Sequence, residues 1–133
     1  MITRIDPDTV PPPPGGWYSH AARVDMGTGA LLFVSGQVAL DDDGDIVGPG
    51  DMERQAQQVF TLLGRLLADQ GAGFGDVVSI RTFVTDMGLL PAYGAVRARH
   101  LPGPPPTSTT VEVTRLVRPE ALVEVDLVAV TGG

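Results

Sequence analysis

A single amphipathic segment constrains the fold of this chain more than any other feature of its sequence. Between residues 51 and 70, apolar side chains recur at helical spacing and form one stripe: Met52, Ala56, Val59, Leu63, Leu66 and Leu67. Asp51 is a suitable N-cap for this helix, and Gly71 is well placed to end it. Because such a helix must bury its stripe, the rest of the chain has to supply a second layer.

The remaining segments predict that this second layer is a β-sheet. Strands are predicted at residues 18–26, 31–38, 77–84, 107–116 and 122–130, and a second helix at residues 86–101. The proline-rich stretch 102–106 ends that second helix. The order strand-strand-helix-strand-helix-strand-strand predicts an α+β fold, in which a single mixed sheet carries two helices on one face.

The sheet face opposite the helices is predicted to carry carboxylates. In the last two strands, apolar side chains alternate with acids and hydroxyls, which places Glu112, Glu124 and Asp126 on that face. Neighbouring carboxylates repel one another, and the cost rises when they are buried. Solvent would relieve this repulsion, and so would a subunit interface that supplies donors. Only the interface would create a cleft with chemistry in it.

The length of 133 residues fits one domain, which is predicted to comprise residues 17–133. Residues 1–16, which contain Pro11–Pro14, are predicted to form an extended Pro-rich N-terminal lead-in. This segment either drapes over the domain or serves as a ligand for a proline-recognition module. No apolar run approaches the roughly 20 residues that span a bilayer, and no secretory signal is evident. We therefore expect a cytoplasmic protein without a membrane partner.

The composition excludes several chemistries. The chain has no cysteine and no lysine, so that all nine of its Lys/Arg cations are arginine. Lysine Schiff bases, P-loop lysines, thiolate nucleophiles and cysteine-ligated metal sites are therefore impossible. The formal charge of -7, without a cluster of arginines, argues against a nucleic-acid partner. The acidic run at residues 41–45 lacks the spacing of a calcium loop.

Seven short motifs together resemble the RidA/YjgF family, also known as endoribonuclease L-PSP-like proteins. They are YSHA at 18–21, FVSGQ at 33–37, QAQQ at 55–58, GDVV at 75–78, TFVTDM at 82–87, VEVTRL at 111–116 and VEVDLVA at 123–129. The resemblance implies a chorismate-mutase-like (YjgF-like) fold and a homotrimer with ligand clefts between subunits. It also implies hydrolysis of reactive enamines and imines to keto acids and ammonia, with no metal or organic cofactor.

The resemblance also assigns site residues. Tyr18 matches the family's cleft-lining tyrosine, and Ser35 and Gly36 match its serine-glycine wall. Glu124 matches the glutamate that positions or activates the attacking water, and it is the candidate catalytic residue. Taken without the family, Glu124 would be read as a surface acid of a strand.

Three cleft positions depart from the family pattern. Ser108 stands where the family has the arginine that clamps the substrate carboxylate, Thr110 where it has a cysteine, and Gly94 where it has an asparagine. An arginine binds a carboxylate through two charge-assisted hydrogen bonds, whereas a serine offers one neutral donor. The chain is thus predicted to be a divergent member with weak or absent 2-iminobutanoate/2-iminopropanoate deaminase activity. Arg97 or Arg99 on the second helix is the candidate replacement anchor.

Three functions remain open from the sequence. The first is a hydrolase of a neutral or cationic imine or enamine, with Glu124 as the base and Ser35, Ser108 and Thr110 as hydrogen-bond partners. The second is a non-catalytic small-metabolite-binding or regulatory trimer. The third is a ribonuclease that uses His20, against which the acidic composition argues.

Overall fold

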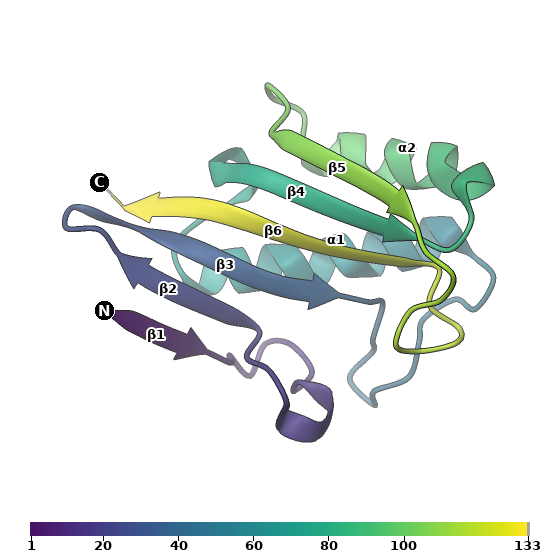
Figure 1. Ribbon diagram of the computed structural model, residues 1–133, viewed down its shortest axis with the longest axis horizontal. Helices are drawn as coiled ribbons and strands as arrows, with labels where there is room; N and C mark the ends of the chain where they lie inside the picture. Colours follow the sequence, from purple (N-terminus) through teal and green to yellow (C-terminus); the bar gives the residue numbers. More distant parts are fainter. Residues whose placement is uncertain (133) are drawn as a thin grey trace.

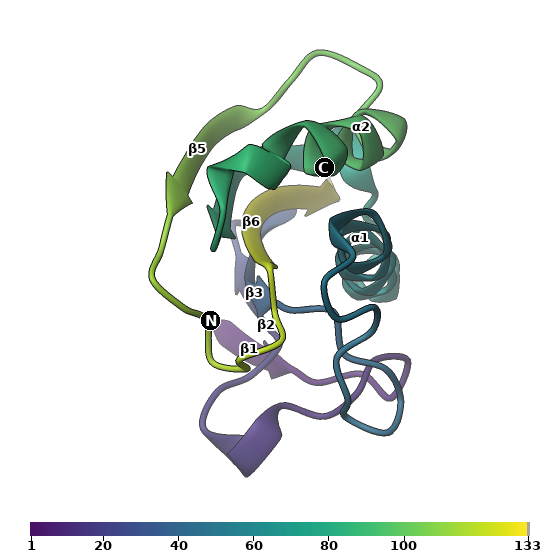
Figure 2. The ribbon, with the colours of Figure 1, turned by 90° about the vertical axis from the view of Figure 1, so that its right-hand side faces the viewer.

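A six-stranded mixed sheet forms one layer of the computed structural model, and two helices cover one of its faces (Figures 1 and 2). The structure describes residues 1–132. The strands are β1 (Ile2–Ile5), β2 (Ala21–Asp25), β3 (Gly29–Gln37), β4 (Val77–Val84), β5 (Thr107–Glu112) and β6 (Val123–Gly132), and the helices are α1 (Met52–Asp69) and α2 (Leu90–His100). Short 3-10 helices span Pro14–Gly16, Phe74–Asp76 and Met87–Leu89. The predicted α+β fold is therefore confirmed.

The strand order is β1-β2-β3-β6-β4-β5. β4 and β5 pair in parallel, and the other neighbours pair antiparallel. β1 was not predicted: the lead-in begins with a short strand on the edge of the sheet, beside β2 (Figure 1). β5 ends at Glu112, four residues before the predicted end.

The apolar stripe of α1 packs on the sheet as predicted, and all six stripe residues are buried. Asp51 caps the helix by accepting a hydrogen bond from the backbone N–H of Arg54 at 3.1 Å. After the helix, Gly71 takes a φ of 71°, the left-handed conformation in which glycine commonly ends a helix. No helix within residues 1–132 is both long and apolar enough to span a membrane.

Alternation along β6 sorts its side chains onto two faces. Val123, Val125 and Leu127 are buried under the helices. Glu124 and Asp126 point to the other side, which we call the open face because neither helix covers it. Both carboxylates therefore lie on the face predicted for them.

The parallel register of β4 and β5 corrects the placement of Glu112. Ser108, Thr110 and Glu112 pair with Ile80, Thr82 and Val84 of β4, whose side chains are buried on the helix side. Paired residues in neighbouring strands share a face, so these three side chains belong to the helix side of the sheet. The prediction that Glu112 shares the open face with Glu124 and Asp126 was therefore wrong. Its carboxylate accepts the Met87 backbone N–H at 2.9 Å instead.

A buried glutamine of α1 fixes the start of β6. Gln55 accepts the Leu122 backbone N–H at 2.8 Å, and it donates to the carbonyl oxygens of Glu120 at 2.9 Å and Gly48 at 3.2 Å. These bonds join the helix to the loop just before Glu124. They show that α1 positions the strand that carries the candidate catalytic carboxylate.

We expect Gln55→Met to lower the free energy of unfolding by about 1–3 kcal/mol, because it leaves buried backbone groups without partners. The matched control is Gln57→Met, an exposed position on the same helix, which should change it by less than about 0.5 kcal/mol. Urea unfolding of the two variants tests this. Equal stability of both would show that the Gln55 contacts contribute little.

Candidate active site

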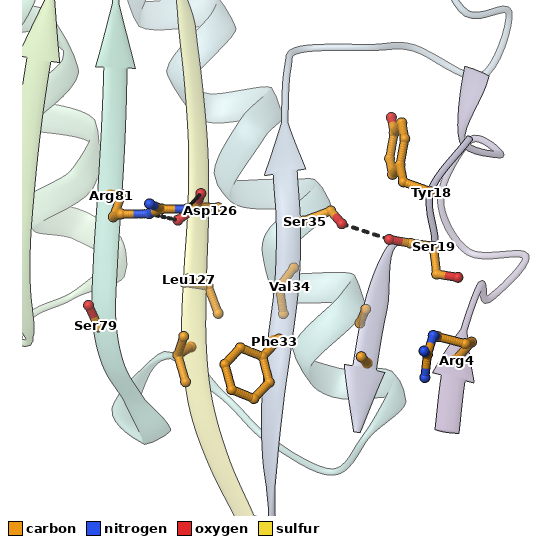
Figure 3. A pocket seen from close by; sticks show the side chains of 13 residues that line it. Arg4, Tyr18, Ser19, Phe33, Val34, Ser35, Ser79, Arg81, Asp126 and Leu127 are labelled. Carbon is orange, nitrogen blue, oxygen red and sulfur yellow. Dashed lines mark hydrogen bonds and ion pairs between the residues drawn. The ribbon is translucent and has the colours of Figure 1, made fainter. Parts of the chain in front are cut away.

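The open face contains a hollow with a volume of about 500 Å³, within the range of small-molecule sites (Figure 3). Strands β1, β2, β3, β4 and β6 and the segment before β2 line it, and the polar side chains are Arg4, Tyr18, Ser19, Ser35, Ser79, Arg81 and Asp126. The predicted residues Tyr18 and Ser35 are among them. Glu124 does not line this hollow, and lies two residues from Asp126 along β6.

Glu124 is packed directly against Gly36. A β-carbon built on Gly36 would collide with Oε2 of Glu124 and would lie only 2.8 Å from its Cδ. A larger residue at position 36 would displace the carboxyl group of Glu124, which occupies the space of a side chain. The predicted wall residue and the predicted catalytic residue are therefore in contact.

The charge state of Glu124 is perturbed by its surroundings. Burial, and to a lesser degree the negative charge of Asp126, raise the pKa of Glu124 above its usual value. No cationic side chain within residues 1–132 forms an ion pair with it. The charge of Glu124 also acts on Tyr18. Burial, and then the charges of Glu124 and Asp6, raise the pKa of the Tyr18 phenol. A half-buried carboxylate with a raised pKa is suited to accept a proton.

Arg81 neutralises the second carboxylate of the open face. Its Nε and Nη2 donate to the two carboxylate oxygens of Asp126 at 2.9 and 2.7 Å, a bidentate pair across β4 and β6 (Figure 3). Arg81 was not predicted from the sequence. Its position between the buried Ile80 and Thr82 does indicate the open face, but only the strand register places it opposite Asp126. Of the two carboxylates, Glu124 is the one left without a counter-cation among the described residues.

Ser35 uses both its hydroxyl and its backbone N–H in hydrogen bonds within the chain. Its hydroxyl donates to the Ser19 carbonyl at 2.6 Å (Figure 3), and its backbone N–H donates to the His20 carbonyl at 2.8 Å. The Ser35 oxygen can still accept a hydrogen bond. The two bonds hold the segment before β2, which carries Tyr18, against β3.

The other predicted residues lie elsewhere in the chain. Ser108 and Thr110 are on the helix side of the edge strand β5, so one chain alone does not bring them beside Glu124. Arg97 donates from Nη1 to the Ser108 hydroxyl at 3.0 Å. Arg99 instead points toward α1, with an exposed contact to Glu53 at 3.7 Å. Of the two candidate anchors, only Arg97 reaches Ser108.

His20 is buried, and both of its ring nitrogens have partners. Nε2 lies 2.6 Å from the Pro11 carbonyl oxygen, and Nδ1 lies 3.2 Å from the amide nitrogen of Gln37. A histidine buried in this way is not placed to contact a bound RNA. Among the described residues, no three histidine, aspartate or glutamate side chains are placed to hold a metal ion.

Comparison with known proteins decides the family. The model of the family "Endoribonuclease L-PSP" matches residues 9–131. The chain belongs to this family. It is 33% identical over 118 residues to the 3-aminoacrylate deaminase RutC of Acinetobacter baylyi, covering 89% of this chain and 90% of that protein. It is 29% identical over 132 residues to the 2-iminobutanoate/2-iminopropanoate deaminase of Mus musculus, covering 99% and 94%.

A solved structure supports the same assignment. A putative endoribonuclease from Thermotoga maritima superposes with a TM-score of 0.86 at 30% identity, covering 100% of both chains. The structural match therefore includes the N-terminal strand β1, which lies outside the residues matched by the family model.

Proposed function

We propose that this protein hydrolyses a reactive imine or enamine to a carbonyl compound and ammonia, without a cofactor. The observation that carries the proposal is the Glu124 carboxyl group, which is half-buried and packed on Gly36, has a raised pKa and has no ion-pair partner among residues 1–132. The names of two relatives, a 3-aminoacrylate deaminase and a 2-iminobutanoate/2-iminopropanoate deaminase, point to the same reaction class.

Hydrolysis of an imine requires only one general base from the protein. Glu124 holds a water molecule and takes a proton from it as the oxygen attacks the C=N carbon. Glu124 passes this proton to the nitrogen, which gives the carbinolamine. It then moves the hydroxyl proton of the carbinolamine to the amino group, so that ammonia leaves as the C=O bond forms and Glu124 is a carboxylate again. The balance is one imine and one water giving one carbonyl compound and one ammonia. An enamine enters the same route after it tautomerises to the imine.

We further propose a homotrimer with the sites between subunits. The open face leaves the large apolar side chains of Phe33 and Val130 44–46% exposed, which favours burial against other copies. In such an assembly, Ser108 and Thr110 on the edge strand of one copy complete the site of its neighbour. This arrangement explains why one chain separates them from Glu124.

The substrate differs from an ordinary 2-imino acid. Ser108 replaces the family's clamping arginine, and Glu124 brings negative charge that repels a carboxylate. Arg97 supplies a single guanidinium behind the Ser108 hydroxyl, so some recognition of anions is retained. We infer that neutral imines are the better substrates and that 2-imino acids are hydrolysed weakly.

A substrate comparison tests this inference. The protein should release ammonia from a neutral imine roughly 10-fold or more faster, in kcat/KM, than from a 2-imino acid, each generated in situ by an oxidase, because a charge-assisted pair is missing. Arg97→Ala should raise KM for the 2-imino acid alone, and Arg99→Ala, its matched control, should leave both substrates unchanged. Equal effects of Arg97→Ala and Arg99→Ala would show that Arg97 does not contact the substrate.

The test also addresses the alternative of a non-catalytic metabolite-binding or regulatory trimer, which the departures at Ser108, Thr110 and Gly94 favour. That function predicts no ammonia release above buffer from either imine. It also predicts a rise in melting temperature with a bound metabolite, because a ligand that binds only the folded state stabilises it.

A further inference from the structure

His20 joins three separate segments of the chain beside the proposed site. Its backbone N–H donates to the carboxylate of Asp6, just after β1, at 2.8 Å. Its ring reaches the Pro11 carbonyl in the proline run on one side and Gln37 at the end of β3 on the other. The side chain is only 3% exposed, so these contacts are shielded from water.

The hydrogen-bond network fixes the tautomer of the ring. The Gln37 amide nitrogen donates to the Ser35 carbonyl at 3.1 Å, which can only accept, and this orients the amide. Facing that NH₂ group, Nδ1 of His20 must accept. Nε2 therefore carries the proton and donates it to the Pro11 carbonyl, which can only accept. The arrangement with the proton on Nε2 and an accepting Nδ1 satisfies both partners.

The ring contacts with Gln37 and with Pro11, which we call the Gln37 arm and the Pro11 arm, both lead to residues of the proposed site. Through Gln37, the ring supports Ser35 and Gly36, the wall on which Glu124 rests. Through Pro11, it docks the lead-in from which the chain continues to Tyr18, and the Tyr18 ring meets the His20 ring edge-to-face at 6.2 Å between centroids. This contact with Pro11 holds the Pro-rich lead-in against the domain.

We propose that His20 is a positioning residue, whose imidazole holds the Ser35–Gly36 wall through Gln37 and the Tyr18 segment through Pro11. The inference rests on the proposed function of Glu124, although its structural part does not. The two arms make separate contributions. The Gln37 arm sets the geometry of Glu124 and thereby kcat, whereas the Pro11 arm orders the lead-in and Tyr18 and thereby KM.

Two substitutions separate the arms. His20→Asn keeps an acceptor near the place of Nδ1 and loses the donor to Pro11, whereas His20→Gln keeps a donor that can reach Pro11 and loses the acceptor for Gln37. We measure kcat and KM for a neutral imine, and the fluorescence anisotropy of Trp17. Trp17 is the chain's single tryptophan and lies next to Tyr18, so its anisotropy reports the order of this segment without any need for turnover.

The expected results differ between the variants. His20→Gln should lower kcat by roughly 10–100-fold, as displaced catalytic groups do, while the Trp17 anisotropy stays at its wild-type value. His20→Asn should keep kcat within about 3-fold, raise KM and lower the anisotropy. His100→Asn and His100→Gln, on the helix side of the molecule, are the matched controls and should change none of the three.

The outcomes distinguish the two proposals. Identical kcat, KM and anisotropy changes in His20→Asn and His20→Gln would overturn the positioning role, because they would reflect a general loss of structure. Unchanged values in both would overturn it as well. If the wild type releases no ammonia above buffer, the proposed function fails, and the anisotropy split between the two variants still decides whether His20 docks the lead-in.

Discussion

Replacement of Glu124 by glutamine is expected to lower kcat for imine hydrolysis by roughly 10²–10⁴-fold, the usual contribution of a general base. Glutamine has nearly the same size and can still bind water, but it cannot take a proton from it. KM should change little, because the substrate contacts remain. Steady-state ammonia release by wild type and Glu124→Gln measures this effect.

The stability of the same variant provides an internal check. The pKa of Glu124 is raised in the folded protein, so the folded state holds this proton more tightly than the unfolded chain does. Its contribution to stability is therefore greatest at low pH and decreases as pH rises from the unfolded pKa through the raised folded pKa. Glutamine does not ionise, so Glu124→Gln avoids this loss of folding stability and should be at least as stable as wild type at neutral pH.

A matched substitution separates the base from a general effect of charge. Glu112→Gln alters a glutamate on the helix side of β5, where an amide oxygen can still accept the Met87 N–H. It should keep full activity. Glu124→Gln with activity within about 3-fold of wild type, at unchanged stability, would show that Glu124 is not the base.

The second large effect is expected from Gly36→Ala, which should lower kcat/KM by roughly 100-fold. The added methyl group would overlap the Glu124 carboxylate, which must then swing away from its place. A displacement of about 1 Å at a catalytic group is enough for a loss of this size. The unfolding free energy should change by less than about 1 kcal/mol, since the group that moves is the end of a flexible side chain.

The control for this substitution is Gly75→Ala, where a β-carbon would meet no atom within 4 Å. That variant should retain wild-type activity. Comparing kcat/KM and urea unfolding of the two variants tests the contact between Gly36 and Glu124. If Gly36→Ala retains wild-type kcat/KM, then either the carboxylate tolerates displacement or it does no chemistry.

The sequence predicted those features that depend on local pattern. The stripe and cap of α1 follow from helical periodicity and from Asp51, and alternation in β6 places Glu124 on the face away from the helices. Both are properties of one segment and its own burial. The family resemblance then made Glu124, Gly36 and Tyr18 candidates together, and the fold brings the three close to one another.

Features that depend on pairing between segments could not be predicted from the sequence. The side chains of β5 are mostly exposed on both faces, so its sequence carries no burial signal to say which face Ser108 and Glu112 occupy. Only the parallel register with β4 decides it. For the same reason Arg81 was missed, since its role requires that it lie opposite Asp126. β1 was missed because its only buried residue is Ile5.

The central claim is that the Glu124 site hydrolyses an imine, and the most direct test is the lifetime of a neutral imine in the presence of the protein. The imine is generated by an amine oxidase, and ammonia is recorded with wild-type protein, with Glu124→Gln and with buffer alone. We predict that wild type accelerates ammonia release far above buffer and that Glu124→Gln falls back toward the buffer rate. A wild-type rate equal to buffer, or an equal acceleration by both proteins, would contradict the account.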